Sequence, residues 1–174
     1  MDMQKVAGVL MIFAGCTGLG VWYGAQFREQ LRLLKELCHV LELFLSEIRF
    51  AKSTLPEGCL RVAGRVTEPF ASLFFEIYNQ SLENTGEGFA EVCNKVLQEG
   101  MKEMNIGEEE KKIFEECFIN TGYEEERMQL KVMEQAKTEL EKKIALLEEG
   151  IVTRCRLAFS LGTMSGLLII ILLW

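Results

Sequence analysis

Cysteine and histidine are the residues with which this chain could perform nucleophilic, redox or metal chemistry. The sequence has six cysteines and one histidine, and no two cysteines have the short Cys-x-x-Cys spacing of redox and zinc motifs. Cys38 and His39 are adjacent, but neighbouring side chains on a helix point about 100° apart and do not face one another as a nucleophile and its base must. We therefore expect the cysteines to pack as small apolar side chains. We expect no metal ion and no cofactor.

Motifs for catalysis are absent from the rest of the sequence. It contains no Gly-rich phosphate loop, no cluster of histidine with carboxylates and no nucleophile elbow. Acidic runs such as Glu108-Glu109-Glu110 are expected on polar helix surface. The net charge of -7 argues against nucleic acid as the main ligand, because a phosphate backbone demands a dominant basic face. We predict a protein that is not an enzyme and binds no nucleic acid.

Two stretches without a charged side chain close the chain at opposite ends, over residues 6–27 and 157–174. A helix needs about twenty apolar residues to cross a hydrocarbon core of about 30 Å. A buried core helix is the alternative for either stretch, but such helices rarely stay free of charge for so long. The predicted domains are an N-terminal transmembrane helix (1–27), a soluble domain (28–156) and a C-terminal transmembrane helix (157–174).

Basic residues flank both predicted spans on the side of the soluble domain. They are Arg28, Arg32 and Lys35 after the first span, and Arg154 and Arg156 before the second. Lysine and arginine are in excess on cytoplasmic flanks. We therefore expect the soluble domain to face the cytoplasm.

The soluble domain has a helical pattern throughout and no alternating strand signal. Apolar residues advance in steps of three and four along both of its ends: Leu34, Leu37, Leu41, Phe44, Ile48 and Ala51 in one stripe, and Met133, Ala136, Leu140, Ile144, Leu147 and Ile151 in the other. The two stripes are expected to meet as an antiparallel, coiled-coil-like stalk or as ordinary core of a bundle. The predicted fold is an all-α helical bundle whose long first and last helices are continuous with the N- and C-terminal transmembrane helices.

Shorter helices are predicted between these two long ones. Thr54, Pro56 and Glu57 combine a threonine cap, a proline in the first turn and a glutamate three residues after the cap, so a helix is expected to begin there. Three more helices are expected: one that opens at Thr67-Glu68-Pro69, one from about Phe89 to Met104, and one from Glu108 to Asn120.

Charge is distributed unevenly within the soluble domain. Its basic end carries Arg49, Lys52, Arg61 and Arg65, whereas residues 108–149 are dominated by carboxylates. A solvated helical face is one interpretation of the basic residues. The other is a surface that contacts anionic lipid headgroups or an acidic partner protein.

Small residues recur at four-residue intervals in both predicted spans. They are Gly20 and Gly24 in the first, and Ala158, Gly162 and Gly166 in the second. Such stripes let helix backbones approach closely in lipid. We expect them to serve transmembrane packing, either between the two spans or with other subunits.

Several motifs together carry a resemblance that extends over essentially the whole chain. They are Glu47-Ile48-Arg49-Phe50, then Ser53-Thr54-Leu55-Pro56-Glu57, Gly122 before the last long helix, Gln129 within it, and Leu161-Gly162 with Gly166-Leu167 near the C-terminus. In these motifs the chain resembles the stage III sporulation protein AB family. The corner at Thr54-Leu55-Pro56-Glu57 is the most specific of them.

The resemblance implies a platform component of the channel complex that links mother cell and forespore, located in the mother-cell membrane that faces the forespore. The helical domain is similar to that of inner-membrane platform proteins of type II secretion and type IV pilus systems, which relay work from a cytoplasmic ATPase. The implied partners are the sporulation AA ATPase, other membrane subunits of the complex and the lipid bilayer, and a homo-oligomer is compatible with it. We expect Arg49, Lys52, Arg61 and Arg65 to form the partner-binding surface, and Thr54, Pro56 and Glu57 to hold the helix that carries part of it.

A sensory or regulatory two-span membrane hairpin is the alternative from another functional class. Its cytoplasmic bundle would respond to a membrane signal, would bind no ATPase, and would be dispensable for spore formation. The sequence does not distinguish a platform that moves from a passive scaffold.

Overall fold

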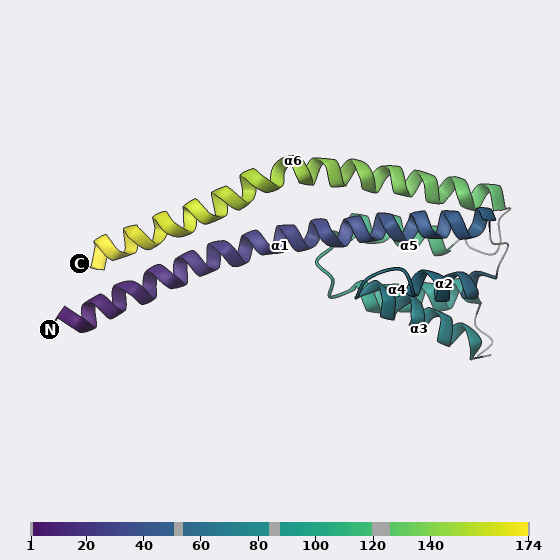
Figure 1. Ribbon diagram of the computed structural model, residues 1–174, viewed down its shortest axis with the longest axis horizontal. Coiled ribbons are helices and arrows are strands. Elements are labelled where there is room, and N and C mark those ends of the chain that lie inside the picture. Colours follow the sequence, from purple (N-terminus) through teal and green to yellow (C-terminus); the bar gives the residue numbers. More distant parts are fainter. Residues whose placement is uncertain (1, 51–53, 84–87, 120–125, 174) are drawn as a thin grey trace. The chain divides into compact units, whose positions relative to one another are not determined.

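The computed structural model describes residues 2–50, 54–83, 88–119 and 126–173, and every regular element in these ranges is an α-helix. The helices are α1 (Asp2–Phe50), α2 (Leu55–Ala63), α3 (Phe70–Leu82), α4 (Phe89–Met101), α5 (Glu108–Ile119) and α6 (Glu126–Leu173) (Figure 1). The predicted all-α bundle is confirmed. Ala51, Lys52 and Gly122, which the sequence analysis singled out, lie outside the described residues.

The chain divides into two compact units. The terminal unit comprises Met1–Leu31 and Ala145–Trp174, and the core unit comprises Arg32–Ile144. Helices α1 and α6 contribute residues to both units, whereas α2 to α5 belong to the core unit alone. Within the core unit α2 packs against α3, α3 against α4 and α4 against α5.

Four phenylalanines form the centre of the core unit. Phe44 of α1, Phe74 of α3, and Phe114 and Phe118 of α5 are buried. The Phe44 ring centroid lies 5.3 Å from that of Phe74 and 5.1 Å from that of Phe118. The Phe114 and Phe118 centroids are 5.1 Å apart, a separation at which aromatic rings attract one another. The cluster therefore joins three helices that are distant in sequence.

The two predicted apolar stripes supply buried residues from α1 and α6. The buried members are Leu34, Leu37, Leu41 and Phe44 of the first stripe, and Met133, Ala136 and Leu140 of the second. Ile48, Ile144 and Leu147 are half-buried. The steps of three and four in the sequence thus identify the faces that these helices turn toward the core.

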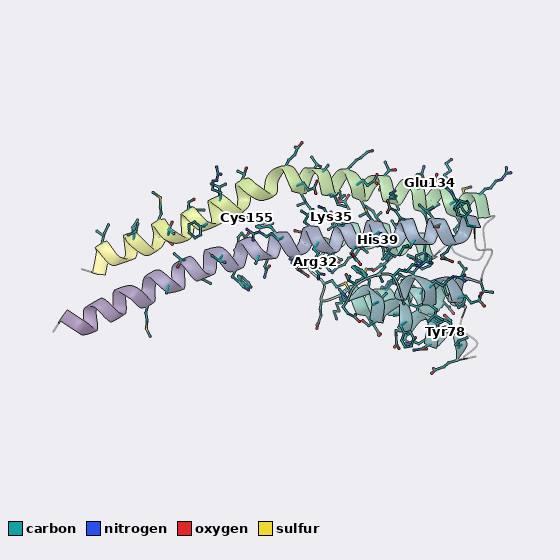
Figure 2. The ribbon with its side chains drawn as sticks, viewed as in Figure 1. Arg32, Lys35, His39, Tyr78, Glu134 and Cys155 are labelled. Atoms are coloured by element: carbon teal, nitrogen blue, oxygen red, sulfur yellow. The ribbon has the colours of Figure 1, made fainter. Side chains whose placement is uncertain are left out.

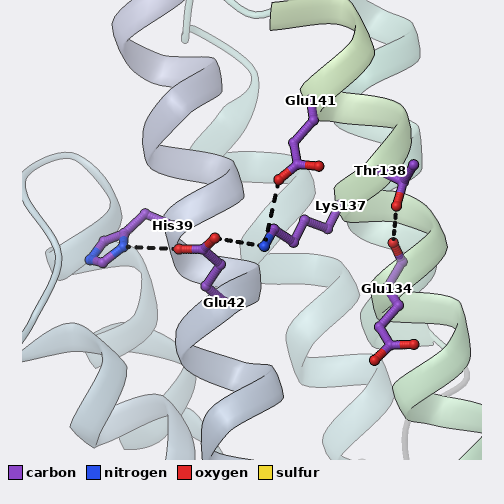
Figure 3. Close-up of polar contacts among 6 residues, drawn as sticks. All are labelled: His39, Glu42, Glu134, Lys137, Thr138 and Glu141. Carbon is purple, nitrogen blue, oxygen red and sulfur yellow. Dashed lines mark hydrogen bonds and ion pairs between the residues drawn. The ribbon is translucent and has the colours of Figure 1, made fainter.

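Ion pairs join the same two helices in the core unit. Arg49 of α1 pairs with Glu134 of α6, which Figure 2 labels. Glu42 of α1 pairs with Lys137 of α6, with 2.6 Å between Glu42 Oε1 and Lys137 Nζ (Figure 3). As α1 is followed backward from Arg49 to Glu42, its partners advance along α6, so the two segments are antiparallel.

Helix α4 ends earlier than the sequence predicts. We expected it to continue to Met104, but the last helical residue is Met101. The backbone tightens there: the Lys102 amide donates to the Glu99 carbonyl, and the Met104 amide to the Met101 carbonyl, at 3.4 and 3.1 Å. Three-residue steps of this kind commonly close the last turn of a helix.

The acidic start of α5 is not simply solvated. Glu109 Oε2 lies 2.5 Å from Lys143 Nζ of α6, and Glu110 Oε1 lies 3.3 Å from the same nitrogen. Lys111 is buried, and its Nζ lies 3.0 Å from Glu108 Oε1. Glu108 and Glu109 are exposed, so the run lies on polar helix surface as expected, and lysines of α5 and α6 form ion pairs with its three carboxylates.

In the terminal unit several glycines are buried and many large apolar residues are exposed. Gly20, Gly24 and Gly166 are buried and Gly162 is half-buried; the side chain of Ala158 is not among those described. A Cβ atom on Gly24 would lie 3.6 Å from Cys155 Sγ and 3.8 Å from Cys155 Cα, and the Cys155 thiol donates to the Gly24 carbonyl at 3.5 Å. The exposed large side chains of this unit include Leu19, Trp22, Leu161, Met164 and Leu168.

The two predicted membrane spans are not borne out as such. Among the residues that the structure describes, no helix has a segment long and apolar enough to cross a membrane. The structure places one helix over the described part of each predicted range, α1 over residues 2–27 and α6 over residues 157–173.

Candidate functional site

The candidate site is built around the start of α2. Thr54 precedes the helix in an extended conformation, and Pro56 occupies its first turn. The Thr54 amide donates to Glu57 Oε2 at 3.3 Å, and the Gly58 amide donates to the Thr54 carbonyl at 3.0 Å. Glu57 therefore satisfies a backbone donor that the start of a helix leaves free.

Helix α2 lies against the end of α1. Gly58 is buried, and a Cβ atom there would lie 3.8 Å from Phe44 Cε1. Cys59 and Val62 are also buried on this side of the helix. The opposite side leaves Leu60 and Arg61 partly exposed.

Glu47 of α1 holds two arginines of the α2 region. Its carboxylate is only 10% exposed, and Oε2 lies 2.7 Å from Arg61 Nε. Oε1 lies 3.5 Å from a terminal guanidinium nitrogen of Arg65. Arg61 is 41% exposed and Arg65 is 56% exposed. One carboxylate thus faces two guanidinium groups, and the cluster of Glu47, Arg61 and Arg65 keeps a net positive charge.

The four basic residues predicted to form one surface do not all pair with the same carboxylate. Arg61 and Arg65 meet at Glu47, whereas Arg49 pairs with Glu134 of α6. Lys52 lies outside the described residues. The structure therefore brings together two of the predicted residues and gives a third a different partner.

Sequence reasoning missed the role of Glu47. It was noticed as part of the Glu47-Ile48-Arg49-Phe50 motif but not as an ion-pair partner. A signal was available: Glu47 follows Phe44 by three residues on the buried side of α1, and Arg61 and Arg65 are four residues apart. A carboxylate on a buried stripe requires a cationic partner.

The Glu47 ion pairs are one tether between α1 and the α2 region, which we define as residues 54–67. A second tether joins α1 to the segment between α2 and α3. Glu36 Oε1 accepts hydrogen bonds from the Thr67 amide and the Thr67 hydroxyl, at 2.7 and 3.0 Å. Glu36 and Glu47 therefore fix both ends of the α2 region to the same helix.

The cysteines and histidine show no catalytic pairing in the described part of the chain. Cys38 is buried, and burial together with the Glu141 carboxylate raises the pKa of its thiol to about 11. Burial raises the pKa of Cys117 to about 12. His39 is exposed and its Nδ1 lies 3.9 Å from Glu42 rather than beside the Cys38 thiol. Across the described ranges, no group of three or more histidine, cysteine, aspartate or glutamate side chains is arranged to hold a metal ion.

A charged network runs between α1 and α6 in the core unit. Lys137 Nζ lies 2.6 Å from Glu42 and 3.5 Å from Glu141, and His39 faces the other oxygen of Glu42 (Figure 3). The hydrogen bond from Lys137 lowers the pKa of Glu42. The same bond raises the pKa of Lys137.

This network makes stability depend on pH at both extremes. Since the Glu42 pKa is lowered on folding, its contribution is present at neutral pH and lost as the pH falls through that pKa. Since the Lys137 pKa is raised, its contribution is present at neutral pH and lost as the pH rises through that pKa. Glu42→Gln should lower the free energy of unfolding by about 0.2–1 kcal/mol near neutral pH, because both side chains are partly exposed.

Chemical denaturation of the full chain at several pH values would measure this effect. The difference between Glu42→Gln and wild type should vanish at acid pH, where the wild-type carboxyl is also neutral. Glu139→Gln is the matched control, since Glu139 is an exposed carboxylate on α6. A difference that persists unchanged at acid pH would contradict the role of the ion pair.

Comparison with known proteins decides the family. A family model described as stage III sporulation protein AB matches residues 5–174. The chain belongs to this family. The recognition made from the motifs is therefore confirmed, and the match includes residues of both the terminal unit and the core unit.

Membership of the stage III sporulation protein AB family agrees with the fold. A solved structure described as "Stage III sporulation protein AB (SpoIIIAB)" is 18% identical in sequence and has a TM-score of 0.65. The similarity covers 71% of this chain and 97% of that one. At this identity the likeness shows a shared fold. No curated protein matches the sequence.

Proposed function

We propose that this member of the family is a non-enzymatic membrane platform component of the channel between mother cell and forespore. It anchors a cytoplasmic secretion-type ATPase and relays the conformational work of that enzyme to the membrane assembly. The observation that carries the proposal is that α1 and α6 each contribute residues to both units. A helix shared by two units transmits displacement better than a loop, which would absorb it.

The terminal unit supports the membrane part of the proposal by its inverted distribution of side chains. Gly20, Gly24 and Gly166 are buried, whereas large apolar residues such as Trp22 and Leu161 are exposed. Helices in lipid associate through small residues and turn large apolar residues to the acyl chains. Exposed apolar surface of this extent is rare on proteins that remain in water. We assign this unit to the mother-cell membrane that faces the forespore.

The cluster at Glu47 supports the contact with the ATPase. Arg61 and Arg65 are half-exposed, and Glu47 balances only one of their two charges. Such a surface favours an acidic patch on a partner protein. We propose that Arg65, with Arg61, Arg49 and Lys52, contacts the sporulation AA ATPase, and that Thr54, Pro56 and Glu57 position the helix.

The path of the relay begins with the two tethers between α1 and the α2 region. A force on α2 reaches α1 through the Glu47 ion pairs and through the Thr67 hydrogen bonds to Glu36. The contact of Gly58 with the Phe44 ring adds close packing at the same place. Close packing and ion pairs transmit displacement because both resist sliding.

Deletion of the gene in its host tests the proposed role. Cells induced to sporulate should arrest after engulfment and yield few heat-resistant spores, and a wild-type copy should restore the yield. A normal spore yield from the deletion would overturn the platform function and would favour the sensory hairpin.

Arg65→Gln tests the proposed surface. This variant keeps the shorter Arg61–Glu47 pair, so the fold should be preserved, and we expect binding of the purified AA ATPase to the reconstituted full chain to weaken about three- to fivefold. Lys95→Gln, a change at an exposed lysine of α4, is the matched control and should bind like wild type. Equal binding by wild type and Arg65→Gln would exclude Arg65 from the contact.

A further inference from the structure

A groove of about 500 Å³ lies between α3 and α4, away from the residues assigned to the ATPase contact. Leu73 of α3, Val96 of α4 and Met104 supply apolar walls, and the first two are buried. Glu76 of α3 and Glu99 of α4 also line it, and both are exposed. The groove therefore combines an apolar interior with two carboxylates at its surface.

The two groove carboxylates differ from the acidic side chains that join helices of the core unit through ion pairs. Glu42, Glu47 and Glu134 each face a lysine or arginine of another helix. Among the described residues, neither Glu76 nor Glu99 has a basic partner within ion-pair distance. Glu76 accepts one hydrogen bond, from Gln80 Nε2 to Oε1 at 2.7 Å, and both side chains line the groove.

Gly100 keeps the groove wall close to the α4 backbone. A Cβ atom at this position would lie 2.6 Å from Leu73 Cδ1 and 3.3 Å from Leu73 Cγ. Such a contact is too short, so any larger residue would displace Leu73 from its buried position. Glycine thus lets the Leu73 side chain lie against α4 next to Glu99 in the wall of the groove.

We infer that this groove binds a segment of a partner protein that is apolar on one face and carries lysine or arginine at its edge. The apolar side chains of the segment enter between Leu73, Val96 and Met104, and its cations pair with Glu76 and Glu99. A volume of about 500 Å³ accepts a few side chains, as in other side-chain pockets. The inference does not depend on the proposed function. The groove contains none of the residues assigned to the ATPase contact, and its partner is cationic, whereas the patch proposed on the ATPase is acidic.

The charge of the groove disfavours anionic occupants. Phosphate or an anionic headgroup would meet the two carboxylates and be repelled. A second copy of this chain has a net charge of -7, which opposes its general approach even though its Arg61 and Arg65 are cationic. A cationic segment is the chemistry that the groove complements.

The experiment uses the full chain in a zwitterionic detergent with ¹³C-labelled methionine methyl groups. The probe is a synthetic amphipathic peptide of leucine and lysine, and a matched peptide has glutamate in place of lysine. The leucine–lysine peptide should shift the Met104 methyl resonance, which the Met104→Leu variant assigns. Its binding should weaken with salt, because the edge pairs are exposed.

Glu76→Gln with Glu99→Gln tests the two carboxylates, and this double variant should bind the leucine–lysine peptide about tenfold more weakly. Glu116→Gln with Glu139→Gln removes two exposed carboxylates from α5 and α6 and should stay within about twofold of wild type. Circular dichroism verifies the fold of both. An unmoved Met104 resonance, equal binding of the two peptides, or equal weakening by the two double variants would each overturn the inference.

Discussion

Replacing Phe74 with alanine is expected to lower the free energy of unfolding of the core unit by about 3–5 kcal/mol. The ring is buried, and its centroid lies 5.3 Å from Phe44, 6.4 Å from Phe114 and 6.0 Å from Phe118. Its removal deletes contacts from α1 and α5 at once and leaves a cavity that fixed helices cannot fill. Guanidinium denaturation of the full chain in detergent, followed by far-ultraviolet circular dichroism, would measure the loss.

Phe75→Ala is the matched control for this change. Phe75 is the next residue of α3, but its side chain is 50% exposed. Its truncation should change the free energy of unfolding by less than about 1 kcal/mol, because little buried area is lost and alanine favours the helix. Equal losses for the two variants would mean that the phenylalanine cluster is not the centre of the core.

The burial of Phe74 could be predicted from the sequence because it belongs to a repeating pattern. Phe70, Leu73, Phe74 and Ile77 follow one another at helical spacing, and all four are buried. A repeat of this kind reports which side of a helix faces the core without naming what it packs against. The pairing of Phe74 with Phe44 and Phe118 depends on how the helices fold back on one another, which no local pattern encodes.

The end of α4 shows where local patterns fail. The sequence predicts a helix that continues to about Met104, but α4 ends at Met101. After Met101 the backbone amides of Lys102 and Met104 instead donate to the carbonyl three residues earlier, and Ile106 beyond them is buried. Tertiary burial of Ile106 is a non-local gain that competes with one more helical turn.

The candidate site was predictable in its residues but not in their grouping. Basic side chains between positions 49 and 65 are visible in the sequence, and three of them are ion-paired in the structure. Which carboxylate each one meets depends on helices that are distant along the chain. Arg49 meets Glu134, 85 positions further along the chain, and no spacing rule predicts that contact.

Glu47→Gln is expected to lower the free energy of unfolding by about 1–3 kcal/mol. The carboxylate is almost fully buried, and the amide cannot balance the charges of Arg61 and Arg65. The loss stays at the lower end of that range because both guanidinium groups reach solvent. Guanidinium denaturation of the full chain would measure this loss. Glu57→Gln is the control that separates it from the cap at the start of α2, because the described hydrogen bond of Glu57 is to the Thr54 amide.

Double-mutant cycles then divide the roles of the two arginines. The coupling between Glu47→Gln and Arg61→Gln should be about 1 kcal/mol or more, because Arg61 Nε lies 2.7 Å from the carboxylate. The coupling with Arg65→Gln should be below about 0.5 kcal/mol, because that pair is separated by 3.5 Å and Arg65 is more exposed. A larger coupling for Arg65 would reverse the assignment. If the coupling energy is larger for Arg61 than for Arg65, Arg61 mainly stabilises the packing of α2 on α1. Arg65 can then pair with a partner protein without destabilising the fold.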